Sequence, residues 1–417
     1  MIKFITKLII FASLLFLVGC VTDTPAQITG TPRTHRGIST TNYEEPFVYE
    51  EPQPVAYPVL YRGPGGNRAM LEPAEGAYLG GWLAPETAIR VFEFQADKRH
   101  AVFVNEINLG EDVPISWLLH NIASLTTPLF VVHPPRTDDF DDVPVTDLII
   151  YLAQRLGSFN LPMFVAFYPT HDLPAAEYTL LFRMARNIFH THAPMVSFVW
   201  MAPSHSATEL NPFFPGHSAV DWVGISLFAC WDAENYFTDI LKMFEEFYMN
   251  FHHHAPVMIL PLGVSHFTRG DYRYRLKQAA EEISRLYNAL QSFPRLGLIV
   301  YADAFSVFRA GNDDFSVSIE PPLMNAYAAA IAGEFFLSSV EKNAANENRW
   351  IRSFYSGYVW EDRIYISTRT AENELNLPAP RQTIEINERF FADARRIPEK
   401  IIRICYERQV IFIENMP

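Results

Sequence analysis

The chain has 417 residues, of which 49% are hydrophobic and 19% charged, so it can bury at least one large core. Its net charge of −14 and the absence of a long basic run argue against nucleic-acid binding, because phosphate contacts need clustered Lys and Arg. No cofactor is expected, because no Gly-rich phosphate loop follows the first predicted strand and no His/Cys pair has zinc spacing.

The amino terminus, residues 1–20, is predicted to be a targeting segment. Two lysines precede the apolar run 8–18, which is too short to span a bilayer comfortably. The run ends in the sequence LVGC, which resembles the lipobox of bacterial lipoproteins. The resemblance implies cleavage before Cys20, a lipid on Cys20, and an extracytoplasmic location anchored to a membrane, at the cell surface or facing the periplasm. A plain secretory signal or an anchor helix is the alternative.

Residues 21–72 are predicted to form an extended or disordered tether, because they are rich in Thr, Pro, Gly and Glu and show no apolar periodicity. The sequence does not define where the tether ends, because the aromatic residues in its second half could pack on the domain that follows. Two cysteines remain beyond the tether, Cys230 and Cys405, and they fall in separate predicted domains. Buried free thiols are expected, and a disulfide between the two is the alternative.

Residues 73–340 contain short apolar runs that alternate with amphipathic helical stretches. Continuous apolar strands separated by helices indicate a parallel sheet covered by helices, and eight units in about 230 residues fit a (β/α)₈ barrel. A doubly wound α/β sheet is the structural alternative, although it usually has fewer strands. The eight expected strands are 77–84, 100–108, 128–134, 162–169, 196–203, 220–228, 256–264 and 296–305.

Residues 349–417 read as a separate small α+β module. The stretch VWEDRIYI predicts a hairpin turning at Glu361-Asp362, and TIEIN and QVIFIE predict further strands. The module resembles the amine-oxidase amino-terminal-like (stalk) repeats of secreted bacterial proteins, and the resemblance rests on the stretches GYVWEDRIYI and IEINERFF. That resemblance implies a structural or adhesion module without chemistry of its own.

The segment around the fifth and sixth predicted barrel strands is the most specific one in the chain. It reads FVWMAPS and then FFPGHSAVDWVGISLF. The segment resembles the β-mannanase-like barrels of glycoside hydrolase family 26, whose pattern is V-W-S-P-N followed by Y-P-G-D-x-x-V-D-W-V-G-I-D. AYLGGWL and FPRLGLIVYAD extend the resemblance over about residues 75–310. From the residues alone, Pro215-Gly216 indicates a turn, Asp221 an anchor at the start of the strand, and Gly224 close packing.

The family resemblance implies two catalytic carboxylates at the carboxyl ends of strands, about 5–5.5 Å apart. In PMFVAFYPTHD, the position of the acid/base Glu is occupied by Thr170, and the expected Arg and His positions are Ala166 and Pro169. In PVMILPLG, the position of the nucleophile is occupied by Pro261. Neither Thr nor Pro can carry out the proton transfer or the attack, so the inherited mechanism is expected to be absent.

Other carboxylates could replace the missing pair. Glu106 ends the second strand, Asp172 follows the fourth, Asp232 and Glu234 follow the sixth, and Asp303 ends the eighth. Asp172 with Asp232 or Asp303 makes the best substitute pair. Each of these residues is also a plausible cap or solvated loop residue. The triple histidine at 252–254 and the acidic run at 136–147 are expected to bind no metal, because their spacing fits neither a zinc site nor an EF-hand.

The predicted mouth of the barrel is rich in side chains that can bind sugar by stacking on pyranose rings. The predicted role of the chain is therefore a cell-envelope lipoprotein, a monomer, that binds a polysaccharide or cell-wall glycan, or serves as a scaffold, without catalysis. The alternatives are an active endo-acting β-mannanase-like hydrolase with relocated carboxylates and a barrel that binds other proteins. Candidate sugar-binding residues are Trp82, Tyr168, Trp200, Phe228, Trp231 and His205, with His133, His171, His217 and His266 expected in loops of the same end.

Overall fold

The structure is a computed structural model of the whole chain, and it divides the chain into residues 1–51 and residues 52–417. Within this chain the described residues are 53–61, 69–85, 87–134, 144–168, 173–202, 211–232, 234, 236–268, 270–304, 313–341, 351–360, 363–375, 377, 380, 382–387, 389–397, 400–405 and 409–415. Cys20 therefore lies outside the described residues. Among those that are described, no helix is both long and apolar enough to cross a membrane.

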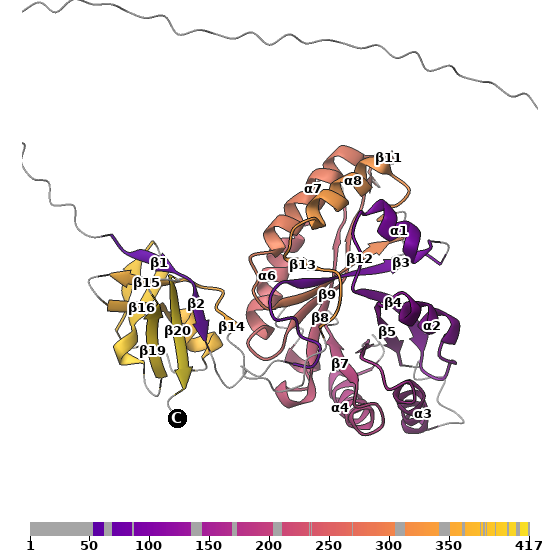
Figure 1. The fold of residues 1–417 in the computed structure, drawn as a ribbon, viewed down its shortest axis with the longest axis horizontal. Coiled ribbons are helices and arrows are strands. Elements are labelled where there is room, and N and C mark those ends of the chain that lie inside the picture. Colours follow the sequence, from indigo (N-terminus) through magenta and orange to yellow (C-terminus); the bar gives the residue numbers. More distant parts are fainter. Residues whose placement is uncertain are drawn as a thin grey trace, which may run out of the picture. The chain divides into compact units, whose positions relative to one another are not determined.

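The centre of the fold is a closed barrel of eight parallel strands, surrounded by helices (Figure 1). The last strand pairs with the first, and Leu298 lies opposite Tyr78. All eight strands predicted from the apolar runs are confirmed, as is the (β/α)₈ fold. The strands are β3 (Ala77–Leu83), β4 (Val102–Asn108), β5 (Thr127–His133), β6 (Met163–Phe167), β7 (Val196–Met201), β8 (Trp222–Ala229), β9 (Val257–Val264) and β12 (Leu296–Asp303).

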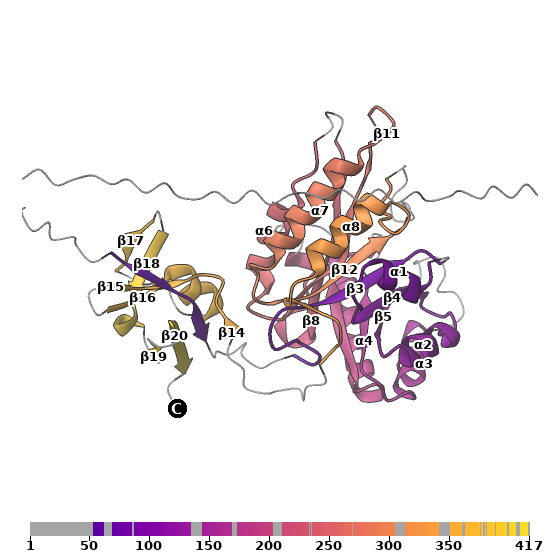
Figure 2. The same ribbon diagram turned by 45° about the horizontal axis from the view of Figure 1, so that its top comes forward.

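The helices of the barrel lie between successive strands and bury one face each. On α7, for example, Ala279, Ile283, Leu286 and Leu290 are buried, which is the three-to-four spacing of an amphipathic helix. Helices α7 and α8 lie side by side in both views (Figures 1 and 2). The helices are α1 (Ile89–Gln95), α2 (Ile115–Ala123), α3 (Val145–Gly157), α4 (Ala175–His192), α6 (Ile240–Phe251), α7 (Leu276–Leu290) and α8 (Pro321–Ile331), with 3₁₀ turns η2 (Asn211–Phe213) and η3 (His217–Ala219) and short strands β10 (Phe267–Thr268), β11 (Arg273–Tyr274) and β13 (Phe336–Leu337).

The residues singled out around β7 and β8 have the structural roles predicted for them. Asp221 Oδ2 accepts a hydrogen bond from the backbone N–H of Phe198 at 2.8 Å, which anchors the start of β8 beside β7. Gly216 has a φ of 96°, which suits glycine in the turn after Pro215. A Cβ on Gly224 would lie 2.5 Å from Met201 Sδ inside the barrel. These residues therefore specify the fold.

The amino-terminal end of the barrel is closed by the segment 69–76, which precedes β3. Leu71 is buried among the interior side chains, and Met70 O accepts hydrogen bonds from Trp222 Nε1 at 2.9 Å and Ser197 Oγ at 3.2 Å. Glu72 is buried as well and forms an ion pair with Arg295 at 3.2 Å. The predicted tether, which was expected to extend to residue 72, therefore ends before this segment.

The carboxyl-terminal module also takes strands from the predicted tether. β1 (Val55–Tyr57) pairs with β15 (Gly357–Trp360), and β2 (Val59–Tyr61) pairs with β20 (Val410–Asn415). The two strands of the predicted hairpin are confirmed, because β15 pairs antiparallel with the next strand and Trp360 lies opposite Arg363, while the turn residues 361–362 lie outside the described residues. The other elements of the module are β14 (Ile351–Arg352), β16 (Arg363–Ser367), η4 (Thr370–Glu374), β17 (Ile384–Ile386), β18 (Arg389–Asp393), η5 (Ala394–Arg396) and β19 (Lys400–Cys405).

The module consists of two sheets with a shared apolar core. One has the strand order β1-β15-β16-β18-β17 and the other β14-β2-β20-β19. Val59, Ile366 and Ile411 are buried in the core. Among its described residues, single helical turns take the place of the helix expected for an α+β module. As predicted, Cys230 in the barrel and Cys405 in the module form no disulfide, although Cys405 is only half-buried.

Candidate functional site

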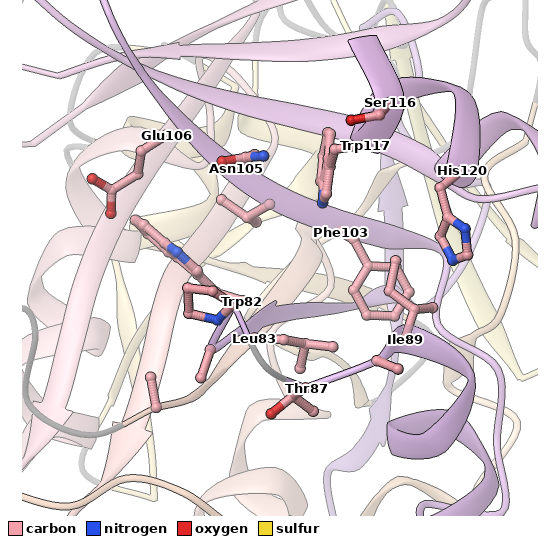
Figure 3. Close-up of a pocket in the computed structure, with 15 residues that line it drawn as sticks. Trp82, Leu83, Thr87, Ile89, Phe103, Asn105, Glu106, Ser116, Trp117 and His120 are labelled. Atoms are coloured by element: carbon pink, nitrogen blue, oxygen red, sulfur yellow. The ribbon is translucent and has the colours of Figure 1, made fainter. Parts of the chain in front are cut away.

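A cavity of about 640 Å³ opens at the carboxyl ends of β3 and β4 (Figure 3). This end of a (β/α)₈ barrel is the one that normally carries the functional site. The connection from β3 to α1 and the first turns of α2 complete the wall. Its lining residues are Trp82, Leu83, Ala84, Pro85, Thr87, Ala88, Ile89, Phe103, Val104, Asn105, Glu106, Ser116, Trp117, His120 and Ala304.

The lining combines two indole rings with a small set of polar groups. Trp82 and Glu106 occupy one side of the view in Figure 3, while Trp117 and His120 occupy the other. Asn105 provides an amide between them. Aromatic faces together with a few convergent polar groups are the composition of a small-molecule or sugar site. Among the described lining residues, Glu106 is the one carboxylate, and there is neither Lys nor Arg.

A row of polar side chains continues from the cavity across the mouth of the barrel. Glu106 Oε2 lies 3.2 Å from His133 Nε2, at the ends of β4 and β5. The His133 ring contacts the Tyr168 ring, with the centroids 5.5 Å apart. Burial raises the pKa of Tyr168, a hydrogen bond with Ser226 acts in the opposite direction, and the Glu106 charge raises it further. The Tyr168 phenol is therefore neutral at physiological pH and can donate a hydrogen bond.

β6 and β9, near which the sequence resemblance implies the catalytic carboxylates, carry none. Residues 163–167 of β6 and 257–264 of β9 are all apolar, and all of them are buried. Pro261 lies where the pairing of β8 with β9 shifts by one residue, because one residue of β8 and two of β9 separate the pairs Ile225–Ile259 and Leu227–Leu262, as in a β-bulge. Proline suits this position because a bulged residue has no ladder hydrogen bond to donate. Thr170 lies outside the described residues.

The substitute carboxylates that the structure describes have structural roles. Asp303 is 1% exposed, and its Oδ1 accepts hydrogen bonds from the backbone N–H groups of Val317 at 2.7 Å and Ser318 at 2.9 Å. Asp232 Oδ1 accepts from the backbone N–H groups of Glu234 and Tyr236, so it closes a turn. Neither residue lines the cavity. Asp172 lies outside the described residues.

The candidate sugar-binding aromatic residues lie in different environments, and only some of them are near the cavity. Trp82 lines the cavity, and Tyr168 lies in the polar row beside it. Trp231 lies against Phe237, with the ring centroids 3.9 Å apart, and under the Arg275 guanidinium. Phe228 is partly covered by Phe315 at 4.9 Å. His205 and His171 lie outside the described residues.

Trp200 is not a mouth residue. It is fully buried on the outer face of β7, where its ring contacts Phe214 and Phe251 at centroid distances of 5.1 and 5.2 Å. The neighbours Val199 and Met201 point into the barrel instead, because side chains alternate along a strand. The expectation that Trp200 binds sugar does not agree with this position.

The histidines are split between the two ends of the barrel. His133 is at the mouth, and His266 is buried beside Asp314 at 3.3 Å. His217, which was expected at the mouth, lies just before β8 at the opposite end, where its ring stacks on His254 with centroids 3.2 Å apart. Within the described part of the chain, no group of three or more His, Cys, Asp or Glu has the arrangement of a metal site.

Most lining residues of the cavity were not among the sequence candidates, and the ones best suited to contact a ligand are Asn105, Trp117 and His120. Trp117 and His120 belong to α2, whose first turns follow β4 and face the mouth. An aromatic residue in the first turn of a helix that follows a barrel strand is a signal that could have identified Trp117. Glu106 was recognised as a carboxylate at a strand end, and its position in the cavity agrees with that.

Comparison with known proteins supports the fold. No protein-family model matches the sequence, and no curated protein matches it. A modular endo-β-1,4-mannanase of glycoside hydrolase family 26 from Cellulomonas fimi has a TM-score of 0.50 at 12% identity, over 67% of this chain and 80% of that chain. A family 26 β-mannanase from Bacteroides ovatus has a TM-score of 0.46 at 11% identity, over 65% and 92%. A family 5 endoglucanase from Clostridium acetobutylicum has a TM-score of 0.43 at 12% identity, over 59% and 90%.

At 12% identity, the likeness to the Cellulomonas fimi structure shows a shared (β/α)₈ fold and nothing about activity. The resemblance of the sequence to family 26 therefore stays a prediction.

Proposed function

We propose that this chain is a membrane-anchored envelope protein whose barrel binds a polysaccharide in the cavity at the ends of β3 and β4, without hydrolysing it by the two-carboxylate mechanism. One observation carries the proposal: an aromatic cavity at the mouth coexists with a β9 strand that has no carboxylate, although the family resemblance implies the nucleophile there. The sequence adds Thr170 at the implied acid/base position. Retaining glycosidases need two carboxyl groups about 5–5.5 Å apart. The likeness in fold to mannanases agrees with a glycan ligand.

Binding without hydrolysis is the expected result when the full-length protein, purified in detergent, is mixed with soluble β-mannans and β-glucans. Titration calorimetry should give a measurable Kd, while an assay for reducing ends should stay at the level of the blank. Trp82→Ala should weaken binding about tenfold or more, because the ring provides a stacking face in the cavity. Trp231→Ala is the matched control, since Phe237 and Arg275 cover that ring, and its Kd should match the wild type.

The rival function is an active hydrolase with relocated carboxylates. New reducing ends that disappear in Asp172→Asn would establish it and overturn the non-catalytic proposal. Absence of binding to every glycan tested would instead support the third alternative, a barrel that interacts with proteins.

The membrane anchor is a separate part of the proposal, and the LVGC sequence at 17–20 supports it. The wild-type protein should incorporate labelled fatty acid in bacterial cells and enter the detergent phase on phase separation. Cys20→Ala should lose both properties, since it removes the only thiol that could carry the lipid near the amino terminus. Equal behaviour of the two proteins would favour a plain secretory signal or an anchor helix.

A further inference from the structure

We infer that the cavity selects glycans that carry protonated amino groups, such as oligomers of glucosamine, because the Glu106 carboxylate stands beside the Trp82 ring in a lining that contains no Lys or Arg among the described residues. This inference rests on the proposed function, and it specifies the ligand class of the same site. It separates amino sugars from neutral hexose polymers and from polymers of uronic or sulfated sugars.

The first argument comes from Glu106 and Trp82. Glu106 is open to a ligand, because its side chain is 42% exposed. Its Oε2 atom faces His133, and its Oε1 atom can accept a hydrogen bond from an ammonium group. An ammonium held over an indole face is attracted by the ring quadrupole as well. A carboxylate next to a tryptophan is therefore a better partner for a cationic amino sugar than for a neutral hydroxyl.

The second argument is the sign of charge around the mouth. The connections that run from a barrel strand to the next helix carry nine acidic and two basic residues within the described part of the chain. Asp232, Glu234, Asp313 and Asp314 are among the acidic ones, and Arg273 and Arg275 are the two basic ones. The undescribed residues of the same connections add seven acidic and three basic residues by sequence, so the sign does not change.

The opposite end of the barrel has a different balance. The connections that lead into β4 to β9 and β12 carry two acidic and three basic residues, and the segment 69–76 before β3 adds Glu72 and Glu75, so the described residues of this end hold four acidic and three basic side chains. The negative potential is therefore concentrated at the end where the cavity opens, and it raises the local concentration of cations while repelling anionic polymers. An anionic glycan would meet both this rim and Glu106, and a neutral glycan would gain nothing from either.

The experiment compares two β-1,4-linked hexamers with the same backbone, glucosamine hexamer and its N-acetylated form, together with β-mannohexaose. Titration of the full-length protein in detergent at pH 6 and low salt should give a Kd for the glucosamine hexamer about tenfold lower than for the acetylated form. The ratio of the Kd for the acetylated hexamer to the Kd for the glucosamine hexamer should fall towards 1 in Glu106→Gln. Glu281→Gln changes the net charge by the same amount at an exposed side chain of α7, and it should leave this ratio unchanged.

A measurement on the wild type alone keeps the test valid if Glu106→Gln does not fold. The preference for the glucosamine hexamer should decrease between about 0.05 M and 0.5 M NaCl, because salt screens partly exposed charges. Equal or tighter binding of acetylated or mannose oligomers would overturn the amino-sugar inference while leaving glycan binding intact. Binding of oligolysine with no binding of any oligosaccharide would overturn both, and would assign the site to a cationic peptide.

Discussion

Glu72→Ala is expected to lower the free energy of unfolding by about 3–5 kcal/mol, because it leaves a buried arginine without its partner. Glu72 and Arg295 are 2% and 4% exposed, and Nε of Arg295 lies 3.2 Å from Glu72 Oε1. Burial by itself lowers the pKa of Arg295, but the charge and hydrogen bond of Glu72, together with Tyr61 and Tyr248, more than offset this and raise it. Because an arginine side chain stays protonated in proteins even when buried, the guanidinium remains charged when Glu72 is removed.

Other hydrogen bonds fix the same pair and explain why the site cannot relax easily. Arg295 also donates to His252 O at 2.7 Å, and the backbone N–H of Ala69 donates to Glu72 Oε2 at 2.8 Å. The pair thus ties the segment before β3 to the start of β12, at the closed end of the barrel. Loss of Glu72 removes that tie together with the charge balance.

Urea unfolding followed by tryptophan fluorescence measures this effect, because five of the seven tryptophans lie between residues 82 and 231 in the barrel. Glu75→Ala, an exposed glutamate of the same segment, is the control and should change stability by less than about 0.5 kcal/mol. The double variant Glu72→Met with Arg295→Met should be more stable than either single variant, since both charges are gone. A Glu72→Ala protein that unfolds like the wild type would show that the pair has no such role.

Loss of stability below pH 6.5 is the second large expected effect. The rings of His217 and His253 both contact His254, with centroids 3.2 and 3.5 Å from its ring. Burial lowers the pKa of His253 and His254 to about 3, with a further lowering from the charges of His217, Arg295 and the neighbouring histidines. The unfolded chain protonates these imidazoles near pH 6.5, whereas the folded chain does not.

The sign follows from proton binding. Between pH 6.5 and pH 3 the unfolded state binds more protons than the folded state, so stability rises with pH over this window. Above pH 6.5 the histidines no longer reduce it. When the pH falls from 7 to 4.5, each of the two imidazoles should lower the free energy of unfolding by about 1–2 kcal/mol, a figure reduced to allow for their partial exposure to solvent.

Urea unfolding at a series of pH values provides the measurement. The double variant His253→Asn with His254→Phe should show a flatter dependence on pH than the wild type, since Phe can still pack on Phe214. His192→Gln, an exposed histidine of α4, should leave the dependence unchanged. An unchanged slope in the double variant would show that the cluster does not titrate on unfolding.

The candidate site could be predicted only in part. Strand ends that carry Trp82, Glu106 and Tyr168 were recognisable, because parallel strands present their carboxyl ends to one side. The cavity itself needed Trp117 and His120, which a helix brings to the mouth. Asp303 was a candidate substitute for a catalytic carboxylate in the sequence, but the chain folds back so that the N–H groups of Val317 and Ser318 donate hydrogen bonds to its Oδ1 atom. Such pairings join residues that are distant in the sequence and leave no local pattern.

The sequence by itself determined the barrel, because a closed parallel barrel covered by helices is the arrangement that buries eight continuous apolar strands separated by amphipathic helices. It also determined that β6 and β9 lack carboxylates. Only the tertiary structure decided that β1 and β2 complete the sheets of the carboxyl-terminal module, since short strands become recognisable through their partners. It also decided the direction of Trp200. In a strand with both faces buried, alternate residues are equally apolar, so the pattern does not tell which set faces the interior.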